Sequence, residues 1–254
     1  MKVGIITDIH ENVGMLSEAL RLAELHKCDE LVCLGDIIGF DSRFYKNNKR
    51  SARACLELIR SNCRWIVAGN HDLHAASRIP SHSDGFIYPG DWFEMSAAER
   101  KKLAGGKVWS YEFDEPNDLG MDDIEFLKTL PEYIITPVNG INYLFSHYTF
   151  PDFTGSTTRY VKRNGQLKDN WKFMKSNKIQ ISFTGHTHNI FAGFAYRISN
   201  PFLMAIHSIP GNNFNLGNEM VIIGLLPLSG DKGRTGFSII DFTNMKMEIV
   251  STTL

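Results

Sequence analysis

The sequence predicts an α/β protein, and three features of the chain indicate this fold class. Between residues 3 and 72, short apolar runs alternate with amphipathic segments, which is typical of parallel strands joined by helical crossovers. From residue 141 onward most apolar runs are separated by turn residues, so this half is predicted to be rich in strands. No internal repeat or linker-like tract divides residues 1–254, and we therefore expect one domain.

The composition narrows the possible functions. With 43% hydrophobic and 22% charged residues, the 254-residue chain can bury a sizeable core. A formal net charge of -1 provides no electrostatic footprint for nucleic acid or for an anionic membrane. The four cysteines lack Cys-x-x-Cys spacing, and the longest apolar run, 220–228, is less than half of the ~20 residues that span a membrane. We expect buried free thiols and a cytoplasmic protein.

The first strand is predicted over 3–7, and it ends in Asp8-Ile9-His10. Residues two apart in an extended chain point to the same side, so Asp8 and His10 can approach one ion together. Asn12 is a predicted N-cap, because apolar residues follow it at helical spacing from 13 to 23. This unit predicts a strand, a turn with metal-binding side chains and a helix.

Two further strands end in polar residues. The apolar run 31–34 is followed by Gly35-Asp36, and a helix is predicted over 50–61. A third strand, 64–68, leads into Gly69-Asn70-His71-Asp72. Gly69 allows a sharp turn, so that Asn70 offers an oxygen and His71 a nitrogen at the end of the strand, where chemistry in α/β sheets is found.

Residues 73–139 show weak periodicity. Short helices are predicted over 96–103, with a capping box from Ser96 to Glu99, and over 121–130, stopped by Pro131. Aromatic residues gather between 86 and 111: Phe86, Tyr88, Trp92, Phe93, Trp109 and Tyr111. Such a cluster is typical of a small satellite core, but an insertion after a site loop is also where substrate caps are built.

The second half repeats the pattern of strands that end in polar residues. The strand 141–145 leads into Ser146-His147, and the strand 179–183 leads into Gly185-His186-Thr187-His188. A short helix is predicted over 169–175, between these two strands. The basic segment 156–166 is expected to be a solvated loop. The remaining strands are predicted over 191–195, 203–208, 220–226, 237–241 and, after a hairpin at Thr243-Asn244, 245–250.

The polar residues at the strand ends form a candidate metal site. They are Asp8, His10, Asp36, Asn70, His71, His147, His186 and His188. Carboxylate, amide and imidazole without thiolate suit two divalent transition ions better than structural zinc or calcium. Two ions about 3.5 to 4 Å apart can share a bridging hydroxide and clamp a phosphoryl oxygen for in-line attack.

These motifs resemble those of the calcineurin-like metallophosphoesterase superfamily, in order along the chain from Asp8 to His188. The runs 7–12 and 35–40 are similar to those of its small bacterial and archaeal phosphodiesterase-like branch. The resemblance implies a four-layer α/β/β/α sandwich with two mixed sheets and two divalent ions, drawn from Mn, Fe, Zn or Ni.

The resemblance also implies a role for each site residue. Asp8, His10 and His188 would hold one ion, Asn70, His147 and His186 would hold the other, and Asp36 would bridge both. His71 would lie off the metals, near the leaving-group oxygen, as a general acid or a donor to the phosphoryl group.

Three positions depart from the family pattern. Glu11 stands where the branch has Gly, and Ser146 precedes His147 where the family has Gly-His or His-Gly. Gly39-Phe40 stands where protein phosphatases of the superfamily carry an Asp-Arg pair. Without that arginine, no side chain at this position can donate two hydrogen bonds to a phosphate dianion. This favours a phosphodiester as substrate, since a diester carries one negative charge fewer.

The sequence therefore predicts a metal-dependent phosphodiesterase acting on a small, soluble phosphodiester. Two alternatives stay open: a phosphomonoesterase or protein phosphatase, and a non-catalytic scaffold. The retromer subunit of the superfamily is such a scaffold and lacks the catalytic histidine, which is present here as His71. The natural substrate and the oligomeric state are not predicted.

Overall fold

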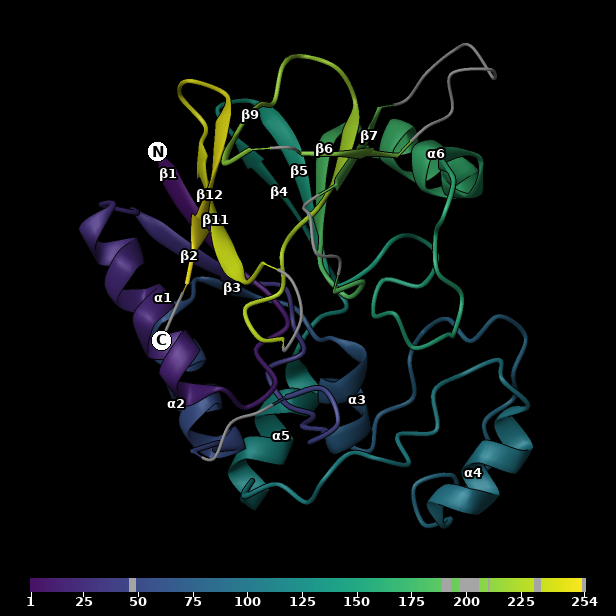
Figure 1. The fold of residues 1–254 in the computed structure, drawn as a ribbon. Coiled ribbons are helices and arrows are strands. Elements are labelled where there is room, and N and C mark those ends of the chain that lie inside the picture. Colours follow the sequence, from purple (N-terminus) through teal and green to yellow (C-terminus); the bar gives the residue numbers. More distant parts are fainter. Residues whose placement is uncertain (46–48, 189–192, 197–205, 210, 231–233, 253–254) are drawn as a thin grey trace.

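The computed structural model describes residues 1–45, 49–188, 193–196, 206–209, 211–230 and 234–252. Two mixed β-sheets lie face to face, and helices cover their outer faces (Figure 1). This is the four-layer α/β/β/α arrangement expected from the sequence.

The first sheet carries the N-terminal half of the site. Its strands are, in spatial order, β3 (Trp65–Ile66), β2 (Glu30–Cys33), β1 (Lys2–Ile6), β11 (Gly236–Asp241), β12 (Lys246–Ser251) and β9 (Asn213–Asn215). β1, β2 and β3 are parallel, and the remaining pairs are antiparallel. The crossovers of the parallel part are α1 (Val13–Leu25) and α2 (Ala52–Asn62), as the alternating pattern predicts.

The second sheet carries the C-terminal half of the site. Its strands are, in spatial order, β4 (Tyr133–Val138), β5 (Ile141–Ser146), β6 (Ile179–Thr184), β10 (Val221–Gly224), β7 (Gly193–Tyr196) and β8 (His207–Ser208). β5, β6 and β10 are parallel to one another. β5 and β6 therefore present their carboxyl ends, and the histidines that follow them, at one edge.

The main core lies between the two sheets, where Ile5, Phe145 and Phe183 are buried. The next residue along β1, Ile6, faces the other way and packs with α1 and α2. This alternation is the period of two expected of a strand. On the far side, Trp171 and Met174 of α6 (Lys168–Ser176), which follows the short 3-10 helix Asn164–Leu167, cover the outer face of the second sheet.

The part of the insertion 73–139 that contains α4 (Ala97–Ala104) and α5 (Met121–Thr129) lies below the two sheets in Figure 1, whereas the end of the insertion forms β4 of the second sheet. The predicted capping box is present, with Ser96 and Glu99 capping each other at the start of α4. Trp92, Ala104 and Val108 form a small core of their own, with Phe86 and Tyr88 packed against it. Leu127 of α5 instead joins the core beneath α1 and α2.

Four elements differ from the sequence prediction. β4 was not predicted, because Pro137 interrupts the run and the strand lies at a sheet edge, where proline is tolerated and burial does not alternate. The short β9 was also not predicted, and β3 is shorter than 64–68. The expected turn at Gly69 is the start of a helix, α3 (Asn70–Ala75). The predicted strands 191–195 and 203–208 lie partly outside the described residues.

All four cysteines are free. Among the described residues, no helix is long and apolar enough to cross a membrane.

Candidate metal centre

The ends of five strands meet at one edge of the sandwich, and every polar residue predicted for the site lies there. β1 leads to Asp8 and His10, β2 to Asp36, β5 to His147, and β6 to His186 and His188. Asn70 and His71 lie in the first turn of α3, directly after Gly69. Three overlapping groups of carboxylate and imidazole ligand atoms form there, each within 4.8 Å: Asp8 with His10 and His188, Asp36 with His147 and His186, and Asp36 with His10 and His71.

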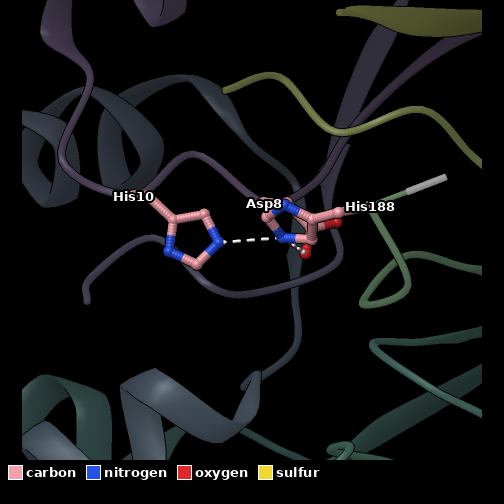
Figure 2. Close-up of side chains that lie close together, drawn as sticks. All are labelled: Asp8, His10 and His188. Carbon is pink, nitrogen blue, oxygen red and sulfur yellow. Dashed lines mark hydrogen bonds and ion pairs between the residues drawn. The ribbon is translucent and has the colours of Figure 1, made fainter. Parts of the chain in front are cut away.

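The first group joins the two sheets. His188 Nε2 lies 2.9 Å from Asp8 Oδ1, and it lies 3.1 Å from His10 Nε2 (Figure 2). His10 Nδ1 donates a hydrogen bond to the Gly39 carbonyl at 2.6 Å, since a carbonyl can only accept. The neutral His10 ring therefore directs the lone pair of Nε2 at His188 and Asp8, as a metal ligand requires.

The second group is buried. His147 Nδ1 donates to the Leu34 carbonyl at 2.9 Å, and its Nε2 lies 3.1 Å from Asp36 Oδ2. The same Asp36 oxygen lies 3.9 Å from His10 Nε2, so Asp36 faces both groups. Three buried atoms of this part of the site make no hydrogen bond: Asn70 Oδ1, His186 Nε2 and His147 Nε2, of which the last still faces the Asp36 carboxylate.

Unpaired buried polar atoms cost stability, and in native proteins they are rare. The Nε2 atoms of His147 and His186 lie beside the Asp36 carboxylate, and a cation bound among these three residues would give both nitrogens a partner. The side-chain amide of Asn70 supports this orientation, because it forms a hydrogen bond with the Tyr111 hydroxyl while its Oδ1 has no partner. The residues present therefore fit a metal ion at this position.

The electrostatics favour a neutral form for His10 and His186 and a charged form for His147, which faces a charged Asp36. Burial, together with the neighbouring histidines His188 and His147 respectively, lowers the pKa of His10 and of His186 to about 3. Burial would raise the pKa of Asp36, but the adjacent imidazoles, His147 foremost, hold it well below its usual value. Burial disfavours a charged His147, yet Asp36 outweighs burial and raises the pKa of His147 to about 9. A proton on His147 and a metal ion are alternative positive charges beside Asp36.

The backbone of the site loops is strained. Five candidate ligands have a positive φ: Asp8 at 55°, His10 at 47°, Asp36 at 51°, His186 at 68° and His188 at 46°. Non-glycine residues rarely adopt this region, and such residues concentrate at functional sites. The surrounding hydrogen bonds hold these conformations, for example from the His186 amide to both oxygens of Asp8.

His71 is fixed by a residue of the insertion. Its Nδ1 lies 2.7 Å from Asp114 Oδ2, and its backbone amide donates to Asp36 Oδ1 at 3.0 Å. Burial lowers the pKa of His71, but Asp114 and Asp36 outweigh it and raise the pKa to about 10. A charged His71 keeps its second ring nitrogen, Nε2, as a proton donor.

Two residues important for this geometry were not assigned a role from the sequence. Asp72 is fully buried and accepts four backbone hydrogen bonds, from Gly69, Asp36, Ile37 and Ile38, at 2.8 to 3.1 Å. It ties the Asp36 loop to the start of α3; its place next to His71 in the motif was the available signal. Asp114 had no such signal, because it lies in an irregular segment 43 residues from His71.

Glu11, which departs from the family pattern, does not add a free charge to the metal centre. Its carboxylate accepts from Arg50 Nη1 at 2.9 Å and from the Gly39 amide at 3.3 Å. Arg50 also donates to Glu115 at 3.1 Å, while the Glu115 amide donates to the Phe40 carbonyl at 2.9 Å. Glu11 and Arg50 therefore anchor the end of the insertion that carries Asp114.

A cavity of roughly 890 Å³ opens over the candidate ligands. Three segments line it: the loop 41–45, the insertion from 101 to 114, and residues 158 and 160 of the basic segment. Arg159 of that segment is exposed and pairs with Asp84 at 2.9 Å, as expected of a solvated loop.

Comparison with known proteins bears on this site. A family model described as calcineurin-like phosphoesterase matches residues 1–189. An uncharacterised protein of Methanocaldococcus jannaschii is 25% identical over 169 residues, which cover 62% of this chain and only 58% of that protein.

Two solved structures resemble the chain along nearly its full length. A metallophosphoesterase from Sphaerobacter thermophilus aligns with a TM-score of 0.68 at 18% identity, covering 100% of this chain and 89% of that one. A hypothetical protein from Pyrococcus horikoshii aligns with a TM-score of 0.59 at 12% identity, covering 99% and 87%. At these identities the likeness shows a shared fold.

Proposed function

The chain belongs to the calcineurin-like phosphoesterase family, and on this premise we propose that it is a phosphodiesterase acting with two divalent metal ions. The observation that carries the proposal is the buried group of Asp36, His147 and His186, whose ligand atoms lie within 4.8 Å of one another and whose histidine Nε2 atoms make no hydrogen bond. A second group, of Asp8, His10 and His188, lies on the other side of the same carboxylate.

In this proposal Asp8, His10 and His188 would hold one ion and Asn70, His147 and His186 the other, with the Asp36 carboxylate available to both. The donors are oxygen and imidazole nitrogen without thiolate, which suits Mn, Fe, Zn or Ni. Bound divalent ions supply positive charge to the phosphoryl oxygens and lower the pKa of the attacking water. The contacts from His10 Nδ1 to the Gly39 carbonyl and from His147 Nδ1 to the Leu34 carbonyl orient both rings before any ion arrives.

His71 is the proposed proton donor to the leaving group. Asp114 holds Nδ1, so Nε2 can donate a proton to the oxygen that departs from phosphorus. Ligand atoms of His71, Asp36 and His10 lie within 4.8 Å of one another, which supports this role. A leaving alkoxide needs this proton more than a leaving phenolate does, since the alkoxide is the stronger base.

The charges of the cavity support a diester rather than a monoester. Among the described lining residues the two non-histidine cations are both paired: Arg43 donates to both oxygens of Asp41, and Lys101 lies 2.7 Å from Glu112. A phosphomonoester dianion would therefore find no unpaired arginine among these residues to donate two parallel hydrogen bonds to its phosphate oxygens. A diester carries one negative charge, which bound metal ions can neutralise.

The insertion 73–139 is the proposed substrate cap, since its residues from 101 to 114 line the cavity. The four free cysteines support a proposed cytoplasmic location, where thiols stay reduced.

The test combines metal analysis with turnover. Elemental analysis of purified, metal-loaded protein is expected to give close to two ions per chain, and bis(p-nitrophenyl) phosphate is expected to be hydrolysed faster than p-nitrophenyl phosphate. His147→Ala is expected to lower the metal content, while His26→Ala at the surface provides the matched control. Preference for the monoester would favour the phosphatase alternative. Protein that holds no ion at any loading would favour the scaffold.

A further inference from the structure

The cavity over the metal centre has an aromatic wall built from segments far apart in the chain. Its six rings are Phe44, Tyr45, Trp109, Tyr111, Phe113 and Tyr160. Phe44, Phe113 and Tyr160 remain 59%, 46% and 38% exposed, so apolar ring surface is open to a ligand.

The wall begins directly at the candidate ligands. The Tyr45 ring stacks on His10, with centroids 4.5 Å apart and an angle of 20° between the planes. The Tyr160 ring stacks on His186 at 5.4 Å and 15°. A group esterified to a phosphorus atom held at this centre would therefore contact the rings without a spacer.

Trp109 joins two of these segments and is held in place. Its indole Nε1 donates to the Gly155 carbonyl at 3.0 Å, and its backbone amide donates to the Ser156 carbonyl at 3.2 Å. Its ring meets Tyr160 edge to face at 6.1 Å. Because these hydrogen bonds fix the Trp109 side chain, a ligand ring that stacks on it restricts little further side-chain motion.

The wall offers little attraction to a second negative group. Arg43 is paired with Asp41 and stacks over the Phe113 ring at 3.2 Å from its centroid, and Lys101 is paired with Glu112. Asp114, which also lines the cavity, pairs with His71. A ligand group carrying its own anionic charge would meet cations whose charge these carboxylates already balance.

We infer that one ester arm of the substrate is a planar, uncharged aromatic group, such as a nucleobase on its sugar or an aryl ring. The inference rests on the proposed phosphodiesterase function. It names the class of diester that the aromatic wall selects, in preference to diesters with aliphatic arms or with a second phosphate.

The test compares two diesters that differ only in aromaticity. Benzyl methyl phosphate and cyclohexylmethyl methyl phosphate have arms of similar size and leaving groups of similar basicity. We expect kcat/KM, measured by chromatography on the metal-loaded enzyme, to be about tenfold higher for the benzyl ester, as stacking on aromatic side chains allows. Equal values would overturn the inference and leave the phosphodiesterase function standing, whereas hydrolysis of no diester would refute the function itself.

Substitutions in the aromatic wall test which rings cause the preference for the benzyl ester. Trp109→Leu and Phe113→Leu are each expected to bring the ratio of the two kcat/KM values close to one. The Phe113 side chain has no hydrogen-bonding atoms and is partly exposed, so its replacement leaves the hydrogen bonds around Trp109 in place. Tyr133→Leu, an exposed aromatic residue of β4 outside the cavity lining, is expected to keep the wild-type ratio. An unchanged ratio in both wall variants would show that the rings do not contact the arm.

A charged probe tests the second half of the inference. A 4-carboxybenzyl methyl phosphate keeps the ring and adds an anion at its far end. It is expected to inhibit hydrolysis of a chromogenic diester at least tenfold more weakly than benzyl methyl phosphate. Tighter inhibition by the carboxylated probe would mean that Arg43 or Lys101 is available to ligands, and the requirement for an uncharged arm would be wrong.

Discussion

His71 Nδ1 and Asp114 Oδ2 lie 2.7 Å apart, although 43 residues separate them in the chain. The contact makes the insertion part of the proposed reaction centre as well as part of its wall. It also has the geometry of an imidazole oriented by a carboxylate, in which one ring nitrogen is held and the other is left to the substrate.

Removing the imidazole tests its role directly. His71→Ala is expected to lower kcat for an alkyl diester more than about a hundredfold, because no other group would protonate the leaving oxygen. Metal content, measured by elemental analysis, is expected to stay at the wild-type value. Near wild-type turnover would remove His71 from the mechanism.

The variant Asp114→Asn separates the effect of Asp114 on the charge and orientation of His71 from its effect on packing. The amide keeps the shape of the side chain but no longer stabilises a charged His71, so kcat for benzyl methyl phosphate is expected to fall about tenfold. The effect is expected to shrink for a p-nitrophenyl ester, whose leaving group needs little protonation. A loss equal on both substrates would indicate a general structural defect; the exposed Asp91→Asn of the same insertion is the control.

Metal removal is expected to destabilise the fold. Chelation leaves Asn70 Oδ1 and His186 Nε2 buried without a hydrogen bond and leaves His147 to its contact with Asp36, whereas bound ions stabilise the folded state by mass action. The melting temperature, followed by calorimetry, is expected to fall on chelation and to recover when Mn is added back. An unchanged melting temperature in protein shown to bind two ions would contradict this account of the three atoms.

Asp72→Asn tests the link between the Asp36 loop and α3. An amide presents one acceptor oxygen where the carboxylate presents two, so some of the four backbone donors lose their partner. The free energy of unfolding in urea is expected to fall by about 3 kcal/mol. Asp122→Asn, an exposed change in α5, is expected to leave it within about 0.5 kcal/mol.

His74 is expected to make stability depend on pH. Burial lowers the pKa of His74 from 6.5 to about 4, and its ring stacks on Tyr111 at 4.1 Å. Between these two pH values the unfolded chain binds the proton more tightly than the folded chain, so the His74 contribution to stability is lost as pH falls from 6.5 toward 4. Melting curves at pH 7.5 and pH 5 are expected to differ less for His74→Phe than for the wild type.

Much of the fold was predictable because its signals are local. The run 3–7, the N-cap Asn12 and the capping box at Ser96 each specify an element through neighbouring residues, and all three are present. The edge strand β4 was not predictable in this way, since its pairing with β5 is decided by the rest of the sheet. Likewise, Gly69 signalled a change of direction, but not that a helix begins there.

The residues of the site also fall into two classes, those that a local sequence pattern indicates and those that no local pattern indicates. Asp8, Asp36 and the histidines are recognisable because each follows an apolar strand, and parallel strands bring their ends together. Asp114, Arg50 and the aromatic wall depend on how a long irregular segment folds back over the strand ends. No pattern within that segment specifies its path.

The hydrogen bonds to Asp72 have a consequence for the choice of metal. The Asp36 loop and the start of α3 are tied together by peptide amides, so the spacing between Asp36 and Asn70 is set before any ion arrives. In the proposed metal centre the ligand spacing would be set by the polypeptide, so the choice among Mn, Fe, Zn and Ni would depend on the metal supply of the cell. The same chain would then work with different metals in cells that differ in manganese, iron or zinc supply. Its activity would depend on the metal available as well as on the protein.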